Sequence, residues 1–337
     1  MGLITFIIKR LSLLPLIALG LAFISFFIGR VVVEDPTRIW IGEKATEEVA
    51  KALIERYHLK DPPYVAFFYY VINLASGDWG ISPRSGQAIL PMILSRFPAT
   101  VELTLFATFL IIIIGIPFGI LSALYKDKLI DHFSRFSSLS GISSPPFLIA
   151  LLLQFILYYK LGFFPSGSRL DPTIPPPPNI TGLFLIDSLI TGNFKTFIAS
   201  LRHIFLPSLA LAILNVGWIV RMTRSTILEV LEKDYIKTAK MKGLKEREFL
   251  YKHVLRNALI PTTTVLAMNF ATMLSGNIVI ETIFGWPGIG RFAVESVLNL
   301  DYPAIIGVSI FYAIIFVLAN FFADLLYAFL DPRIKVG

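Results

Sequence analysis

Residues 221–261 read RMTRSTILEVLEKDYIKTAKMKGLKEREFLYKHVLRNALIP and lie between two apolar runs, each long enough to cross a bilayer. The stretch carries ten Lys or Arg residues against five Asp or Glu residues. Asp234 is a suitable helix N-cap, and Gly243 follows Lys240 and Lys242 as a suitable residue after the last helical turn. The sequence therefore predicts a short helix, a glycine turn and a second helix.

The predicted second helix has an apolar side. Its apolar residues recur at three- and four-residue spacing: Phe249, Leu250, Val254, Leu255, Ala258 and Leu259. Pro261 is expected to stop or kink the helix where the next apolar run begins. Two interpretations fit a charged loop with an apolar face between spans. It is either a docking surface for a soluble partner, or a solvated basic loop that follows the positive-inside rule.

The whole chain has the composition of a membrane protein. Its mean hydropathy is +0.72, and 16% of its 337 residues are charged, against about 25% in soluble domains. About 20 apolar residues, at a rise of about 1.5 Å each, cover a hydrocarbon core of roughly 30 Å. Six uncharged stretches reach that length: 11–28, 103–125, 136–159, 204–220, 257–280 and 302–323. We therefore predict an all-α, polytopic membrane protein with six transmembrane helices and both termini in the cytoplasm.

The net charge of +7 is confined to one side of the predicted membrane. With the N-terminus inside, the cytoplasmic segments hold 17 of the 30 Lys and Arg residues and nine of the 23 acids, a net charge of +8. The remaining segments carry a net charge of −1. This asymmetry is what the positive-inside rule predicts. Binding of nucleic acid is therefore not needed to explain the basic character, and no nucleic-acid partner is expected.

Three regions follow from these spans. Residues 1–30 form an N-terminal lead and the first span, and residues 31–100 form an extracytoplasmic cap segment with helical periodicity in 43–59. Residues 101–337 form a core of five helices. The core contains the basic loop, 223–260, and an external loop, 281–303.

The sequence offers no catalytic machinery of its own. It has no cysteine and contains no G-x-x-x-x-G-K-[ST], H-E-x-x-H or G-x-S-x-G motif, so we expect no catalytic residue, no metal site and no bound cofactor. Glu102, Glu281 and Asp324 stand near the ends of predicted spans, whereas an ion-coupled carrier usually keeps a titratable group near mid-membrane. A transporter without a nucleotide site or an ion site of its own must be driven by a partner protein. The basic loop is where we expect that partner to bind.

Two segments of the basic loop carry a family resemblance. DYIKTAKMKG and HVLRNALIP resemble the cytoplasmic EAA loop of ABC-importer permeases, in the form found in the first-permease (B-type) subunits of the oligopeptide/dipeptide/nickel family. The resemblance implies a helix that couples to an ATPase subunit through Asp234, Tyr235, Thr238, Ala239, Lys242 and Gly243. One departure is that Lys237-Thr238-Ala239 stands where Glu-Ala-Ala would be expected, which bears on the choice of ATPase.

A second block, VIETIFGWPGIGRFAVESVLNLDYPAIIG (279–307), resembles the segment between spans five and six of the same permeases. There the segment folds back toward the translocation path. The resemblance implies a re-entrant external gate within 281–303, formed by Phe284, Gly285, Trp286, Pro287, Gly288 and Gly290. The other interpretation is an interfacial loop with an aromatic anchor.

Four polar residues in or near the spans are candidates for lining the pathway: Gln154, Asn269, Ser275 and Asn277. Polar side chains in hydrocarbon face a bundle interior or a pore, because an unpaired polar group there is costly. Hydrogen bonding between helices is the alternative for each of them.

The resemblance implies a type I ABC-importer permease fold in the plasma (inner) membrane. The expected partners are a second homologous permease, two ABC ATPase subunits that hold ATP and Mg, an extracytoplasmic solute-binding protein, and the lipid bilayer. The expected function is to form half of a pathway for di- or oligopeptides. Two alternatives remain: the same fold carrying oligosaccharides or nickel chelates, or an ion-coupled secondary transporter or channel.

Overall fold

The computed structural model describes residues 47–241 and 243–330, together with residues 12, 15–16, 19–20, 22–24 and 26–27 of the first apolar stretch. The predicted N-terminal lead, Lys242 and residues 331–337 lie outside this description. Within it the chain is helical, with one isolated bridge between Ile81 and Ala88. The helices are α3 Glu47–Arg56, α4 Pro63–Ala75, α5 Ile89–Leu124, α6 Leu129–Ser143, α7 Pro146–Leu153, η2 Gln154–Lys160, α8 Phe184–Ile190, α9 Phe194–Leu231, α10 Asp234–Met241, α11 Glu246–Glu248, η3 Phe249–Leu255, α12 Arg256–Leu274, α13 Ile278–Ile283, α14 Ile289–Leu298 and α15 Tyr302–Leu330.

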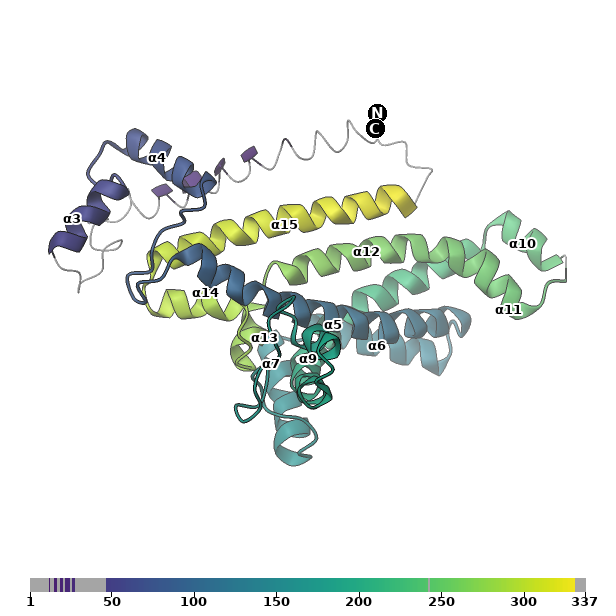
Figure 1. The fold of residues 1–337 in the computed structure, drawn as a ribbon. Helices are drawn as coiled ribbons and strands as arrows, with labels where there is room; N and C mark the ends of the chain where they lie inside the picture. The colour runs from purple at the N-terminus through teal and green to yellow at the C-terminus, as the bar shows by residue number, and fades with distance from the viewer. Residues whose placement is uncertain are drawn as a thin grey trace.

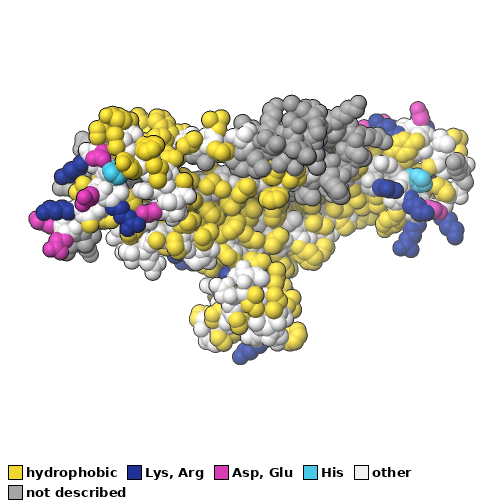
Figure 2. Space-filling view, turned by 45° about the horizontal axis from the view of Figure 1, so that its top comes forward, with side chains coloured by type: hydrophobic (Ala, Val, Ile, Leu, Met, Phe, Trp, Pro, Cys, Tyr) yellow, Lys and Arg dark blue, Asp and Glu magenta, His cyan; other side chains and the backbone are white. Residues whose placement is uncertain are grey.

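The long helices run between two ends of the molecule (Figure 1). One end, which we call the cap end, carries α3, α4 and α14, and the opposite end carries α10 and α11 (Figure 1). Figure 2 shows hydrophobic side chains over the middle of this face, with most charged side chains gathered at the two ends. This distribution is the one a bilayer-spanning protein requires, because charged groups are costly in hydrocarbon.

Helix α9 is the centre of the packing, since α5, α6 and α12 all lie against it. It approaches α5 closely at Gly119, where an added Cβ would come within 2.5 Å of the Cβ of Thr223. Gly115, one turn earlier, lies in the same way against Val216 and Ile219. Small residues let membrane helices approach closely, so this pair sets the distance between the two longest helices.

Three described helices are long and apolar enough to cross a membrane: 89–124, 194–231 and 302–325. Helix α6 and the α7–η2 segment also pass this test together, although they meet at an angle of 108°. The bend falls at Pro145-Pro146, where a helix cannot continue unbroken. The described residues thus give three spans, or four if the bent pair counts as one, against the six that we predict from the sequence.

Two predicted details differ from the structure. Helix α12 runs through Pro261 and ends at Leu274, so of the predicted stop or kink the stop does not occur. Membrane helices tolerate an internal proline because neighbouring groups satisfy the freed backbone carbonyl. Of the cap helix predicted over 43–59, residues 43–46 lie outside the described residues, and α3 ends at Arg56, three residues earlier than predicted.

Candidate coupling loop and gate segment

The loop predicted to contact an ATPase begins directly where α9 ends. Only Glu232 and Lys233 separate α9 from α10. After α10, Gly243 has a φ of +69°, a backbone conformation that L-residues with a side chain rarely adopt. The chain then returns through α11 and η3 into α12. A movement of α10 would therefore act directly on α9.

Helix α10 has one buried side and one exposed side. Ile236 and Ala239 are buried and belong to a core formed with Ala123, Ile227 and Val254 from three long helical segments. Six residues of α10 are exposed: Asp234, Tyr235, Lys237, Thr238, Lys240 and Met241. Tyr235 is 48% exposed. Of the predicted coupling residues, Ala239 thus faces the protein interior, whereas Asp234, Tyr235, Thr238 and Gly243 are exposed.

The first residue of α10 is Asp234, where the sequence predicts an N-cap. Its carboxylate accepts a hydrogen bond from Lys237 Nζ at 2.9 Å, and Thr238 Oγ1 donates to its carbonyl at 3.0 Å. The salt bridge is exposed and therefore contributes little to stability. The exposed side of α10 therefore carries both a negative and a positive side chain.

A buried ion pair lies between α6 and α9, seven residues before α9 ends. The guanidinium of Arg224 donates to both carboxylate oxygens of Asp131, from Nε at 2.7 Å and from Nη2 at 2.8 Å. Ser122 Oγ and the backbone N–H of Asp127 also donate to the Asp131 carboxylate, at 2.6 and 3.0 Å. Asp131 is fully buried, so this cluster joins α5, α6 and α9 near the coupling loop.

The predicted gate segment (281–303) is folded onto the start of α5. Phe284 and Trp286 are each 1% exposed. The indole Nε1 of Trp286 donates to the carbonyl of Ala99 at 2.8 Å, and the backbone N–H of Ser168 donates to the carbonyl of Phe284 at 2.7 Å. Arg291 Nη1 donates to the carbonyl of Gly285 at 2.7 Å. The aromatic residues are therefore packed inside the protein, with the segment closed against α5.

Glu281 holds the two short helices of the gate segment together. It is fully buried, and its carboxylate accepts from Thr100 Oγ1 at 2.8 Å and from the backbone N–H of Arg291 at 3.1 Å. Thr100 in turn accepts from the backbone N–H of Ile289 at 2.9 Å. Only glycine fits at position 288, because a Cβ there would overlap the Glu281 carboxylate. A carboxylate at the start of α14 also suits the positive end of the helix dipole.

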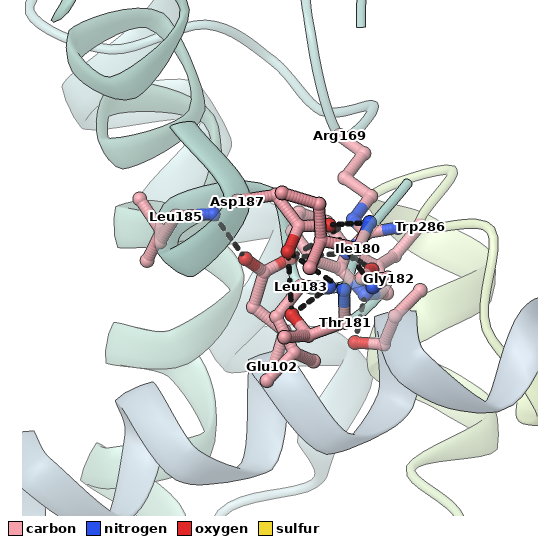
Figure 3. A network of polar contacts seen from close by, with 10 residues as sticks. Glu102, Arg169, Ile180, Thr181, Gly182, Leu183, Leu185, Asp187 and Trp286 are labelled. Carbon is pink, nitrogen blue, oxygen red and sulfur yellow. Dashed lines mark hydrogen bonds and ion pairs between the residues drawn. The ribbon is translucent and has the colours of Figure 1, made fainter. Parts of the chain in front are cut away.

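A long connection, residues 161–193, is fastened to α5 beside the gate segment (Figure 3). Arg169 donates to Glu102 Oε2 from Nε at 2.9 Å and from Nη2 at 2.6 Å, and its guanidinium lies 3.7 Å from the centre of the Phe184 ring. The other carboxylate oxygen of Glu102 accepts from the backbone N–H of Leu185 at 2.7 Å. Both charged side chains are at most 10% exposed.

Asp187 organises the same connection from within (Figure 3). Its carboxylate accepts from the backbone N–H groups of Ile180, Thr181 and Gly182 and from Thr181 Oγ1. Burial by itself raises the pKa of Asp187, but the hydrogen bonds from Thr181, Ile180 and Gly182 outweigh it and hold the pKa below its ordinary value. These hydrogen bonds therefore make the connection an ordered element beside the gate segment.

The four pathway candidates lie in different surroundings. Gln154 donates to the carbonyls of Ser166 at 2.7 Å and Ile283 at 3.3 Å, so it joins the 161–193 connection to α13. Ser275 and Asn277 each donate to a carbonyl four residues earlier in the chain. Asn269 Nδ2 is buried and has no hydrogen-bond acceptor. Lining of the pathway by these four residues stays a prediction.

Sequence reasoning missed the pairs that hold the site together. Glu102 and Glu281 were placed at the ends of spans, but their partners Arg169 and Thr100 are 67 and 181 residues away in the chain. Arg224 and Asp131 are 93 residues apart. One local signal was present, since a carboxylate in a mostly apolar run needs a partner. The sequence could not indicate which residue provides it.

These features define a class of protein: a multi-pass membrane component whose helices join an exposed charged loop to a buried gate segment at the other end. Residues 115–336 match the family described as "Binding-protein-dependent transport system inner membrane component". The chain belongs to this family.

Its relatives are transport permeases similar over nearly their whole length. The chain is 39% identical to the "Probable D,D-dipeptide transport system permease protein DdpB" of Escherichia coli (strain K12), covering 96% of this chain and 95% of the relative. It is 40% identical to the "Dipeptide transport system permease protein DppB" of Alkalihalophilus pseudofirmus and 36% identical to the "Oligopeptide transport system permease protein AppB" of Bacillus subtilis. Each alignment covers 98% of this chain and 99% of the relative. The family resemblance inferred from the sequence is thereby confirmed, and the chain is a permease subunit of an importer.

Proposed function

We propose that this chain forms half of the translocation pathway for di- or oligopeptides and that separate ATPase subunits drive it through α10. The names of its relatives support peptides as the cargo. The structural observation that carries the coupling role is the two-sided character of α10. Its inner side packs on the ends of long helices, and its outer side is exposed at one end of the molecule.

Two further features support this mechanism. The buried Arg224–Asp131 pair lies between the end of α9 and the neighbouring helices, so a push on α10 would move α5, α6 and α9 together. At the cap end, Trp286 and Glu281 connect the gate segment to α5. Packed elements of this kind switch between discrete arrangements and do not deform continuously.

The proposed orientation places the cap end outside the cell and α10 in the cytoplasm. In this orientation six transmembrane helices leave both termini in the cytoplasm. The chain would bind no ATP itself, and ATP and Mg would be held by two ABC ATPase subunits. A second homologous permease would supply the other half of the pathway, and a solute-binding protein would deliver cargo at the cap end.

Reconstitution in liposomes with the partner subunits and the binding protein tests this proposal. We expect ATP-dependent uptake of peptide, stimulated by the loaded binding protein. Tyr235→Ala should weaken retention of the ATPase subunits and slow uptake. The control is Tyr64→Ala, which alters a more exposed tyrosine (77%) of α4 at the cap end.

Each competing function predicts a different result. Uptake driven by an ion gradient without any ATPase would reject the importer mechanism in favour of a secondary transporter or channel. Uptake of an oligosaccharide or a nickel chelate, with none of peptide, would keep the mechanism and change the cargo.

A further inference from the structure

A cavity of about 290 Å³ opens at the cap end, outside the gate contacts described above. It lies between the segment before α5, the first turns of α5, helix α14 and the start of α15. Its volume is close to the lower bound of about 300 Å³ for small-molecule sites. Arg84, Arg96, Glu295 and Asn299 supply charged and polar groups, and Met92 and Phe292 supply apolar surface.

Arg96 is the half-buried cation of this cavity and forms no ion pair with a described residue, whereas the other cation, Arg84, is exposed. The guanidinium of Arg96 lies 4.4 Å from the centre of the Phe292 ring, and Nη1 donates to the carbonyl of Met92 at 2.8 Å. Among the described residues no carboxylate lies within 4.0 Å of it. Five N–H donors belong to a guanidinium, so most of them are free for a ligand. A half-buried cation without an anion is costly, and a bound carboxylate would offset this cost.

The two acids of the cavity are already engaged elsewhere. Glu295 Oε1 accepts from Arg291 Nε at 2.7 Å. The carboxylate of Asp301 accepts from Ser82 Oγ and from the backbone N–H of Ala304. Neither acid neutralises Arg96, yet Glu295 keeps a second carboxylate oxygen with no partner among the described residues.

The cavity therefore presents a cation and an anion to the same ligand. A compact anion such as phosphate would be repelled by Glu295 and would leave the Met92 and Phe292 surface unused. A short zwitterionic peptide matches both charges, with its terminal carboxylate toward Arg96 and its ammonium group toward Glu295. We infer that this permease itself carries a subsite for the free carboxylate end of a short peptide, at the Arg96 cavity. This inference rests on the peptide cargo proposed above.

Direct binding of a dipeptide tests the subsite. The probe is radiolabelled Ala-Ala, measured by equilibrium binding to the complete permease–ATPase assembly in nanodiscs without the solute-binding protein. We expect saturable binding that weakens at least tenfold in Arg96→Gln, with Arg96→Lys intermediate because lysine cannot bind a carboxylate with two parallel hydrogen bonds. The control is Arg202→Gln, which removes an exposed arginine that also donates to a backbone carbonyl, that of Phe163. It should bind Ala-Ala as the unaltered protein does.

The ligand can be altered as well, so the test stands even if Arg96→Gln fails to assemble. The C-terminal amide of Ala-Ala should bind the unaltered protein at least tenfold more weakly than Ala-Ala. N-acetyl-Ala-Ala should also be weaker, and Glu295→Gln should remove the difference between the acetylated and free peptides. Equal binding of Ala-Ala and its amide, or no saturable binding at all, would overturn the inference.

Receptor docking is the competing use of this cavity. If Arg96→Gln weakens binding of the solute-binding protein but leaves Ala-Ala binding unchanged, the cavity receives an acidic side chain of the receptor and the inference is wrong. Receptor-dependent uptake of Ala-Ala, measured in parallel, separates the two proposals. Uptake of Ala-Ala without direct binding would support the proposed function and reject the subsite. Direct binding without any peptide uptake would support the subsite and reject the proposed function.

Discussion

Arg224 of α9 forms a two-point ion pair with the fully buried carboxylate of Asp131 of α6, with N···O distances of 2.7 and 2.8 Å. Ser122 of α5 donates to the same carboxylate at 2.6 Å. Three helices therefore meet at one charged cluster close to the coupling loop. A fixed planar geometry of this kind resists rotation of one helix against another.

Arg224→Gln should destabilise the protein by about 3–5 kcal/mol, because it leaves the buried Asp131 carboxylate without its cation. In assemblies that form, stimulation of ATP hydrolysis by cargo should be lost. The control is Arg221→Gln, one turn earlier on α9, where the guanidinium lies over the Trp218 ring at 4.7 Å. Thermal unfolding of both variants checks this expectation, and equal midpoints would contradict it.

Gly243→Val should weaken retention of the ATPase subunits while membrane insertion stays normal. Gly243 has a φ of +69°, and forcing an L-residue into that region costs about 1–2 kcal/mol. Gly192→Val is a matched control, because Gly192 has a φ of +67° and, like Gly243, has nothing within 4 Å of an added Cβ. Co-purification of the ATPase subunits is the measurement. If both valine variants retain them equally, the coupling role of this turn is wrong.

Trp286→Ala should destabilise the gate segment by about 3–5 kcal/mol, because it empties a fully buried site and removes the hydrogen bond to Ala99. We expect higher basal ATPase activity or leak of cargo through the reconstituted assembly. Trp218→Ala, which truncates a tryptophan that is 44% exposed, serves as the comparison. Unchanged basal activity and leak in Trp286→Ala would make the segment a passive loop.

Arg169→Met should cost about 3–5 kcal/mol, because Glu102 would remain buried and unpaired. The double variant Arg169→Met with Glu102→Gln should recover a large part of that loss, since the uncompensated charge is then removed. Comparison of the unfolding midpoints of both single variants with that of the double variant measures the coupling. Strictly additive effects would show that the two side chains do not interact.

Asp187 should make the 161–193 connection sensitive to acid. Because its folded-state pKa lies below the ordinary value of about 3.9, its stabilisation is present above that pH and is lost as the pH falls below it. Asp187→Asn should lower the unfolding midpoint at pH 7, and the difference from the unaltered protein should shrink below about pH 4. A difference that stays constant with pH would contradict the ionised state of Asp187.

Residue spacing and helix-capping preferences predicted the helices of the coupling loop better than the contacts these helices make. Residue spacing and the turn at Gly243 were sufficient to predict a short helix beginning at Asp234. The same rules treat all prolines alike, yet the chain bends at Pro145-Pro146 and α12 continues through Pro261. Packing of neighbouring helices decides between these outcomes, and a single sequence does not contain that information.

The partners in the buried polar contacts were even harder to predict from the sequence. Glu102 and Arg169 meet only because the 161–193 connection folds back onto α5. Such partners follow from the tertiary arrangement, whereas hydropathy indicates only that an isolated carboxylate needs one.

Helix α9 reaches from the cap-end connection to α10 as one element of 38 residues, which corresponds to a rod about 57 Å long. Within its first third His203 Nδ1 contacts the carbonyl of Gly167 at 2.8 Å, and beyond its last residue α10 follows after two residues. Such a rod works as a lever: a tilt of about 10° about its midpoint would displace each tip by about 5 Å. In the mechanism proposed above, a small movement of α10 would therefore displace the 161–193 connection through α9 itself.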